Sequence, residues 1–330
     1  MASQEDGTSG GGLGTGAGGE TPQSGHRSGF VAIIGAPNAG KSSLMNRFLG
    51  QKVAIVTKKP QTTRHRILGV LTWPSGQIAF CDTPGIHDSP KALNREMVSR
   101  ALSALSDSDV CLWLVDGASR GPDHRRALEM VMARRDRMPL VAAINKADLL
   151  DPPALAELSG QIAGQASPDG LLGVSAMTGQ GLRRLRRTLA ALLPEGPPLF
   201  EEDALTDQSL RTIAAEHVRE AVFELTRQEI PYSTAVTVDE FLEPGPGEAR
   251  PLFRISATIH VERDSQKRVM VGRNGSMLRD VGRRARLGLE AFLGTPVFLS
   301  LFVRITKDWS GDARALEEFG YRDGPGRPGR

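Results

Sequence analysis

The chain has 330 residues, which at about 150 residues per domain allows two folded domains. No apolar run approaches the ~20 residues of a membrane-spanning helix, and the first residues lack the apolar stretch of a secretory signal. The two cysteines, Cys81 and Cys111, lack metal-type spacing, which favours a reducing cytoplasm, and a net charge of +3 is too small to indicate a partner by itself.

Residues 1–28 are rich in glycine, serine and threonine. Such a composition cannot bury enough apolar surface to fold, so we expect a disordered tail.

The next stretch carries the strongest motif of the sequence. An apolar run, Phe30–Ile34, predicts a buried strand, and apolar residues at helical spacing follow between Ser43 and Gly50. The residues between them fit the pattern G-x-x-x-x-G-K-[ST], and they are Gly35, Ala36, Pro37, Asn38, Ala39, Gly40, Lys41 and Ser42. A glycine loop between a strand and a helix points its N–H groups at phosphate oxygens. Lys41 would reach the β- and γ-phosphates and Ser42 would ligate Mg²⁺, whereas the alternative is a simple turn before a helix.

A polar segment lies between Val53–Val56 and the predicted strand Ile67–Trp73. Its central residues are Gln61, Thr62, Thr63, Arg64 and His65. A loop with two threonines suits a switch that closes onto Mg²⁺ when a triphosphate is bound. The sequence does not separate Thr62 from Thr63; we favour Thr63. A solvated surface loop is the alternative.

The next predicted strand, Gln77–Cys81, ends at Asp82, Thr83, Pro84 and Gly85. A carboxylate at a strand end can hold the metal through water, and Gly85 lets the backbone approach the γ-phosphate. Ile86 stands where Ras-like switches use a glutamine to orient water, and isoleucine cannot form hydrogen bonds. We therefore expect slow intrinsic hydrolysis, with water positioned by another group, the backbone or a cation.

Two more apolar runs, Val110–Asp116 and Leu140–Ile144, predict buried parallel strands, separated by helices near residues 92–105 and 123–134. The second run ends at Asn145, Lys146, Ala147 and Asp148. The Asp148 carboxylate can accept two N–H groups of guanine, Asn145 would brace the loop, and the Lys146 stem can cover the base. After the strand at 171–174, a backbone N–H among Ser175, Ala176 and Met177 could reach guanine O6, although a helix N-cap alone would explain Ser175.

Four motifs at the carboxyl ends of strands predict a doubly wound α/β domain that binds GTP or GDP, over residues 29–193. The motifs resemble those of the translation-factor-like small GTPases, and the phosphate loop with the Gln61–His65 segment is similar to the Era-type branch. The resemblance implies catalytic roles for Lys41, Thr63 and Gly85, metal ligation by Ser42, Thr63 and Asp82, and a K⁺ ion near Asn38.

A proline-rich acidic linker at 194–208 precedes a second region, for which we expect the order helix, two strands, two helices and a final strand. The expected ranges are 208–227, 233–241, 252–261, a first helix before Gly272, a second helix to Leu293, and 297–305. The α+β order over 209–310, with Gly272-x-x-Gly275 between two helices, resembles a type II KH domain.

A tight Gly-x-x-Gly turn lets a nucleic-acid backbone pass close by. Residues 263–286 carry a net charge of +6, which suits phosphate contacts; a solvated helix face with i,i+4 pairs is the alternative. The expected RNA contacts are Lys267, Arg268, Gly272, Arg273, Asn274, Gly275 and Arg279. Residues 311–330 are expected to form a polar tail, with a short helix near 314–319.

The Era-type resemblance runs from Gly29 to Arg322. It implies a cytoplasmic, monomeric GTPase that binds the 3′ end region of the small-subunit (16S) rRNA, assists assembly of the 30S ribosomal subunit, and contacts the inner face of the cell membrane peripherally. Two alternatives remain open: a GTPase whose second domain docks protein or membrane partners, and a non-catalytic RNA-binding scaffold whose nucleotide site is structural.

Overall fold

The computed structural model describes residues 25–57, 59, 62–64, 66–85, 92–119, 122–134 and 137–322. Most of the expected N-terminal tail lies outside these residues, as do Gln61, His65 and Ile86.

The first half of the chain forms a six-stranded sheet in the order β2-β3-β1-β4-β5-β6. Adjacent strands are parallel except for the edge pair β2 and β3, which is antiparallel. The strands are β1 (Arg27–Gly35), β2 (Ile67–Trp73), β3 (Gly76–Asp82), β4 (Val110–Asp116), β5 (Leu140–Asn145) and β6 (Gly170–Gly173). Because β1 begins at Arg27, Arg27 and Ser28 belong to the sheet and not to the tail in which the sequence analysis placed them.

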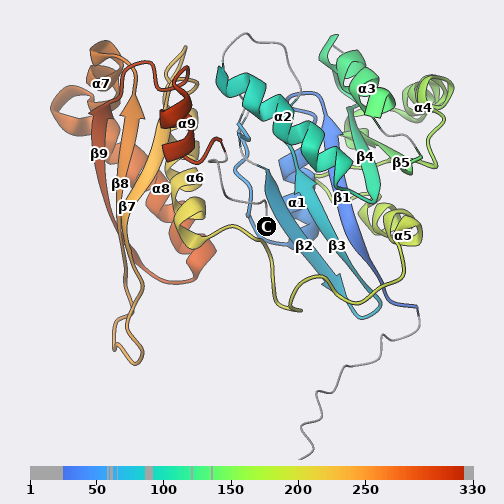
Figure 1. Cartoon of the computed structure of the whole chain (residues 1–330), viewed down its shortest axis with the longest axis horizontal. Helices are drawn as coiled ribbons and strands as arrows, with labels where there is room; N and C mark the ends of the chain where they lie inside the picture. Colours follow the sequence, from blue (N-terminus) through green and yellow to red (C-terminus); the bar gives the residue numbers. More distant parts are fainter. Residues whose placement is uncertain are drawn as a thin grey trace, which may run out of the picture.

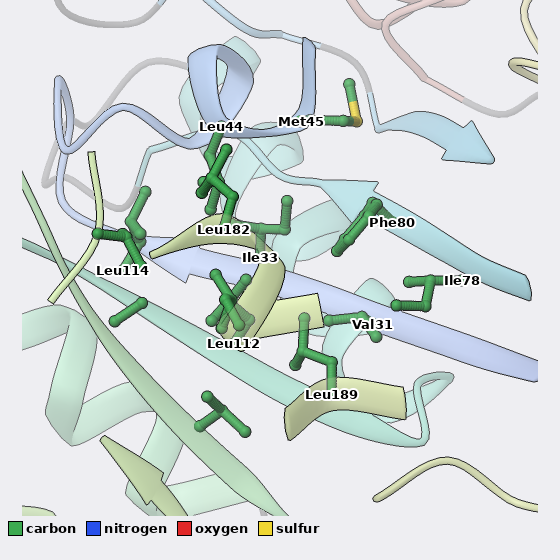
Figure 2. Close-up of a cluster of buried hydrophobic side chains, with 14 of the residues drawn as sticks. Val31, Ile33, Leu44, Met45, Ile78, Phe80, Leu112, Leu114, Leu182 and Leu189 are labelled. Carbon is green, nitrogen blue, oxygen red and sulfur yellow. The ribbon is translucent and has the colours of Figure 1, made fainter. Parts of the chain in front are cut away.

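Helices cover both faces of this sheet because its strands alternate between two apolar sides (Figure 1). Val31 and Ile33 of β1 pack against α1 (Lys41–Leu49) and α5 (Leu182–Leu192). Figure 2 shows this cluster, in which Leu44 of α1 and Leu189 of α5 lie over the strands. The other face carries α2 (Ala92–Ser106), α3 (Pro122–Arg134) and α4 (Pro152–Ala166). The doubly wound α/β architecture is confirmed, with α4 as a helix that the sequence analysis did not specify.

The connection at 194–208 runs along the β2 edge of the sheet. Leu205 accepts a backbone hydrogen bond from Val70 of β2 at 2.9 Å. The Gln77 side chain accepts from the backbone N–H groups of Leu199 and Phe200 at 2.7 and 2.9 Å. The linker is therefore attached to the first domain along its path.

The second half of the chain forms a three-stranded sheet in the order β7-β8-β9, in which β7 is antiparallel and β9 parallel to β8. Two helices, α6 and α8, pack on one face through residues such as Val222 and Ala285. The elements are α6 (Leu210–Leu225), β7 (Ala235–Leu242), β8 (Phe253–Val261), α7 (Asp264–Val271), α8 (Ser276–Leu293) and β9 (Val297–Ile305), with the one-turn η2 (Arg273–Gly275) between α7 and α8. This is the order expected from the sequence.

Residues 309–322 pack between the two halves of the molecule, which differs from the polar tail expected from residue 311 on. Helix α9 (Ala313–Glu318) faces α2 in Figure 1. Trp309, Leu316 and Tyr321 are almost completely buried, in one cluster with Leu93 and Met97 of α2. The segment has few apolar residues among many polar ones, so the sequence does not predict that it packs. Those few residues are enough to dock it because α2 lies opposite them.

The neutral, buried His217 of α6 makes stability pH-dependent. Its side chain lies under α8, where a Cβ at Gly288 would stand 2.7 Å from Nδ1. Burial lowers the pKa of His217 to about 4, and Lys52 adds to this lowering. The unfolded chain takes up the proton near pH 6.5 and the folded chain does not, so stability present above pH 6.5 is lost as the pH falls towards 4.

We predict that the free energy of unfolding falls more steeply between pH 7 and pH 5 in the native chain than in His217→Gln. Between pH 7 and pH 5 the native chain should lose about 2 kcal/mol more of its free energy of unfolding than the variant loses, as measured by urea denaturation. Equal pH slopes for the two proteins would contradict the assignment, whatever their absolute stabilities.

Candidate functional site

The phosphate loop joins the end of β1 to the start of α1, and its conformation requires glycine. Gly40 has a φ of 95°, and a Cβ there would overlap the side-chain amide of Asn145. Asn38 also lies in the left-handed region, with a φ of 61°. These angles turn the backbone sharply just before the helix N-terminus, where unpaired N–H groups can face an anion.

Lys41 lies at the base of this loop with an exposed fraction of only 6%. Its ammonium group donates to the carbonyl oxygens of Gly35 and Ala36, each at 3.0 Å. Burial lowers the pKa of Lys41 to about 8, although Asp82 opposes this change. A buried ammonium that is held mainly by carbonyls gains most from a nearby anion, which phosphate oxygens would supply.

Three oxygen-bearing side chains meet beside Lys41. The Ser42 hydroxyl lies 2.9 Å from that of Thr63 and donates to Asp82 Oδ2 at 2.5 Å. The other carboxylate oxygen, Oδ1 of Asp82, is buried and has no hydrogen-bond partner within the described part of the chain. Burial raises the pKa of Asp82 to about 6, against the lowering by Lys41 and Ser42. Hard oxygen donors with one orphaned acceptor fit the ligand preference of Mg²⁺.

The two switch threonines take different directions. Thr63 is buried and points to Ser42, whereas the Thr62 hydroxyl bonds Thr57 at 2.7 Å and the carbonyl of Lys59 at 2.8 Å. The geometry therefore favours Thr63 over Thr62 as the residue that reaches the metal.

Gly85 and Thr83 connect the end of β3 to the phosphate loop. A Cβ at Gly85 would stand 3.0 Å from Cα of Pro37, so a side chain would crowd the loop. The Thr83 hydroxyl donates to the carbonyl of Ile33 at 2.8 Å, which ties β3 to β1. Pro84, between them, completes the segment expected from the sequence.

Asn145 links the phosphate loop to the segment after β6. Its amide donates to the carbonyl of Ala39 at 2.8 Å, and its carbonyl oxygen accepts from the N–H of Ala176 at 2.9 Å. The next residue, Lys146, forms an ion pair of 2.6 Å with Asp116 at the end of β4. Asp116 was not among the residues singled out from the sequence, because a carboxylate ending an apolar strand carries no motif of its own.

A cavity of about 1160 Å³ joins these motifs. Its walls include Lys41, Thr63, Gly85, Asp148 and the segment Ser175–Met177. Ala147 attaches the segment after β5 to the segment after β6, because its N–H donates to the carbonyl of Val174 at 3.0 Å. The cavity thus brings together a cation, two hydroxyl groups and a carboxylate, which a nucleotide with its metal would need.

The second expected site is the turn between α7 and α8. Gly272, Asn274 and Gly275 have φ angles of 72°, 51° and 76°, and Arg273 and Asn274 are exposed. A Cβ at Gly272 would stand 2.7 Å from the backbone nitrogen of Met277, so this position excludes a side chain. The turn is therefore tight, exposed and flanked by basic residues.

The positive charge around this turn is partly neutralised by ion pairs. Arg268 pairs with Asp264 at 3.1 Å, and Arg284 pairs with Glu224 at 2.5 Å. Arg286 lies 3.9 Å from Glu290. Five basic residues of the segment form no ion pair with other described residues: Arg263, Lys267, Arg273, Arg279 and Arg283.

Two exposed aromatic residues on the edge strand β9 were missed by the sequence analysis. Phe298 and Phe302 are 54% and 60% exposed and lie on the sheet face opposite the helices. Their cross-strand partners on β8 are Arg254 and Thr258. The alternation of β9 could have revealed them, since Leu299, Leu301 and Val303 fill the buried positions between and beside them.

Comparison with known proteins gives the same two parts. The model of the 50S ribosome-binding GTPases matches residues 30–146, and the KH domain model matches residues 229–310. GTPase Era of Syntrophus aciditrophicus (strain SB) is 46% identical over 298 residues, covering 90% of this chain and 96% of that protein. GTPase Era of Geobacter sp. (strain M21) is 47% identical over 295 residues, covering 89% and 98%.

Two solved structures are similar over nearly the whole chain. One is Era in complex with MgGDPNP and nucleotides 1506–1542 of 16S ribosomal RNA, with 39% identity, a TM-score of 0.83, and coverage of 90% of this chain and 99% of that one. The other is a variant of Aquifex aeolicus Era bound to GDP and AlF₄⁻, with 38% identity, a TM-score of 0.84, and coverage of 89% and 99%. The chain belongs to the Era family of GTPases, with a P-loop GTPase domain followed by a C-terminal KH domain.

Proposed function

We propose that this GTPase is a GTP-dependent switch that binds the 3′ end region of small-subunit rRNA through its KH domain and assists assembly of the 30S subunit. The observation that carries the proposal is the pairing of a complete nucleotide cavity with an exposed Gly272–Gly275 turn in one chain. Similarity to an Era structure that contains MgGDPNP and a 16S rRNA fragment supports both halves.

In this proposal Lys41 binds the β- and γ-phosphates, and Ser42, Thr63 and Asp82 hold Mg²⁺ directly or through water. The metal would supply charge neutralisation between the phosphates. The buried Asp82 Oδ1 and the meeting of the two hydroxyls at 2.9 Å support this ligand set. Gly85, which has no side chain to crowd Pro37 of the phosphate loop, can offer its N–H to the γ-phosphate.

RNA binding rests on the unpaired cations and on the aromatic face of the KH domain. Lys267, Arg273 and Arg279 can contact the sugar–phosphate backbone near the Gly-x-x-Gly turn, with Gly272 and Gly275 allowing its close approach. Phe298 and Phe302 offer flat surfaces on which unpaired bases can stack. Both features favour a single-stranded target.

Cytoplasmic location, the monomeric state and peripheral membrane contact stay predictions. Within the residues that the structure describes, none of the helices combines the length and apolar character needed to cross a bilayer. A docking role of the KH domain for proteins or membranes is the competing function, and the first experiment below separates it from RNA binding.

We predict that an RNA fragment from the 3′ end of small-subunit rRNA stimulates GTP hydrolysis, whereas a scrambled RNA does not. Phosphate release is measured with each RNA, for the native chain and for Gly272→Asp. The aspartate adds a negative charge and a Cβ where the backbone is crowded, so stimulation should be lost while basal hydrolysis persists. Equal rates with both RNAs would contradict the ribosomal role.

Asp148→Asn should change the preferred base of the nucleotide from guanine to xanthine. The carboxylate accepts the N1–H and exocyclic N–H of guanine, whereas an amide can donate to the O2 of xanthine. We expect GTP affinity to fall by at least about 100-fold, with a gain for xanthosine triphosphate, measured by competition with a fluorescent nucleotide. Unchanged preference for GTP would remove Asp148 from base recognition.

A K⁺ ion near Asn38 would supply charge where Ile86 cannot orient water. We predict that replacing K⁺ by Na⁺ at constant ionic strength lowers the hydrolysis rate of the native chain, and that Asn38→Ala abolishes this difference. The measurement is phosphate release in matched chloride buffers. Identical rates in the two salts would contradict the potassium site.

A further inference from the structure

Arg64 of the switch segment reaches out of the GTPase domain into the KH domain. Its exposed fraction is 2%, although it lies on a loop. The guanidinium donates to the carbonyl oxygens of Thr234, Tyr232 and Pro231 at 2.7, 2.9 and 3.1 Å. These three carbonyls lie within the four residues that lead into β7, so they form a cradle for a planar, multi-donor cation.

Aromatic rings complete this pocket. The guanidinium carbon lies 5.8 Å from the ring centres of Phe223 and Trp309 and 5.7 Å from that of Tyr321. Trp309 is itself fixed by a hydrogen bond of 2.9 Å to the carbonyl of Ser233. Cations over aromatic faces are stabilised most where water is excluded, so the pocket compensates Arg64 for its lost hydration.

Other contacts bring the same segments together. The Lys59 ammonium donates to the carbonyls of Phe223 and Thr226 at the end of α6. Glu220 of α6 accepts from Lys52 at 2.6 Å and from the N–H of Val56 at 3.0 Å. The switch segment is thus attached to the KH domain before and at Arg64.

The neighbouring residue in the chain is Thr63, whose hydroxyl meets Ser42 at the metal site. Consecutive Cα atoms are about 3.8 Å apart, so a fixed Arg64 leaves Thr63 little freedom. If the KH domain moves away, Arg64 loses all three carbonyls and returns to water, and the restraint on Thr63 is released. The structure shows the inserted position, and the solvated position would be the second of the two states that an allosteric element requires.

We propose that Arg64 is the positioning residue through which the KH domain controls Thr63 and hence the binding of the triphosphate. Insertion of Arg64 into the pocket of Phe223, Trp309, Tyr321 and the 231–234 carbonyls favours the GTP-bound arrangement of the switch. The proposal rests on the assignment of Thr63 to Mg²⁺ made above.

The test measures the affinities of the full chain for fluorescent GDP and for a fluorescent non-hydrolysable GTP analogue, both in Mg²⁺. Arg64→Gln should weaken the analogue by about tenfold and leave GDP unchanged, because only the γ-phosphate draws Thr63 to the metal. Arg64→Lys should fall between, since an ammonium keeps the charge without the planar fork.

Arg66→Gln is the matched control, because Arg66 lies two residues on in the same segment and no hydrogen bond or ion pair with the KH domain is found for it among the described residues. It should leave both affinities unchanged. An equal loss of GDP and analogue affinity in Arg64→Gln would show a general structural role and overturn the proposal, as would unchanged analogue affinity.

Two further variants separate the possible failures. Thr63→Ala should also weaken the analogue selectively; if it does not, the metal assignment fails. If Thr63→Ala has the effect and Arg64→Gln does not, only the coupling fails. Tyr321 forms one wall of the pocket and lies near the C-terminus, so Tyr321→Leu disturbs the pocket without changing the switch segment. It should reproduce the loss of analogue affinity even if Arg64→Gln does not fold. Native analogue affinity in Tyr321→Leu would contradict coupling through this pocket.

Discussion

Lys41 and Asp82 place two opposite, buried charges beside Ser42 at the nucleotide cavity of the GTPase domain. Neither is well compensated by the described residues alone: burial lowers the pKa of Lys41 to about 8 and raises that of Asp82 to about 6. Phosphate oxygens and a divalent cation satisfy both groups at once. The bare backbone at Gly40 and the amide of Asn145, which donates to the carbonyl of Ala39, fix the loop that leads to Lys41.

The same site is connected to the second domain through the switch. The Thr63 hydroxyl lies 2.9 Å from that of Ser42, at the proposed metal site, and its neighbour Arg64 is enclosed by the KH domain, so one peptide bond separates the two environments. Helix α2 adds a second connection, because Leu93 and Met97 share a buried cluster with Trp309, Leu316 and Tyr321. A change at the γ-phosphate therefore has a physical route to the RNA-binding domain, and the linker along β2 is not the only link between them.

The sequence predicted what depends on local pattern. Apolar runs located the strands, and glycine and proline marked their ends. The motif at Gly35–Ser42 located the candidate phosphate loop between β1 and α1, because such a loop needs a fixed spacing. The Gly272–Gly275 turn could be found for the same reason. From the sequence we favoured Thr63 over Thr62 as the metal ligand, and the hydrogen bond between Thr63 and Ser42 is consistent with that preference.

The features that could not be predicted from the sequence depend on contacts between distant segments of the chain. In the sequence Arg64 is one of several loop cations, and only the fold brings it to the carbonyls of Pro231, Tyr232 and Thr234. Asp116 gains its role only when Lys146 folds onto it from the next strand. Nothing in the sequence indicated that residues 309–322 are buried, because their aromatic residues pack against α2, which is distant in the chain. Pairing of Arg284 with Glu224 likewise joins α8 to α6 and could not be counted from charges along one helix.

The central claim is that nucleotide state and RNA binding are coupled in one molecule. The most direct test is the affinity of a labelled RNA from the 3′ end of small-subunit rRNA, measured by fluorescence anisotropy with GDP and with a non-hydrolysable GTP analogue. We predict that RNA binds more tightly with the analogue than with GDP. By linkage, RNA must raise the affinity for the analogue, relative to GDP, by the same factor. The same RNA affinity in both nucleotide states would contradict it.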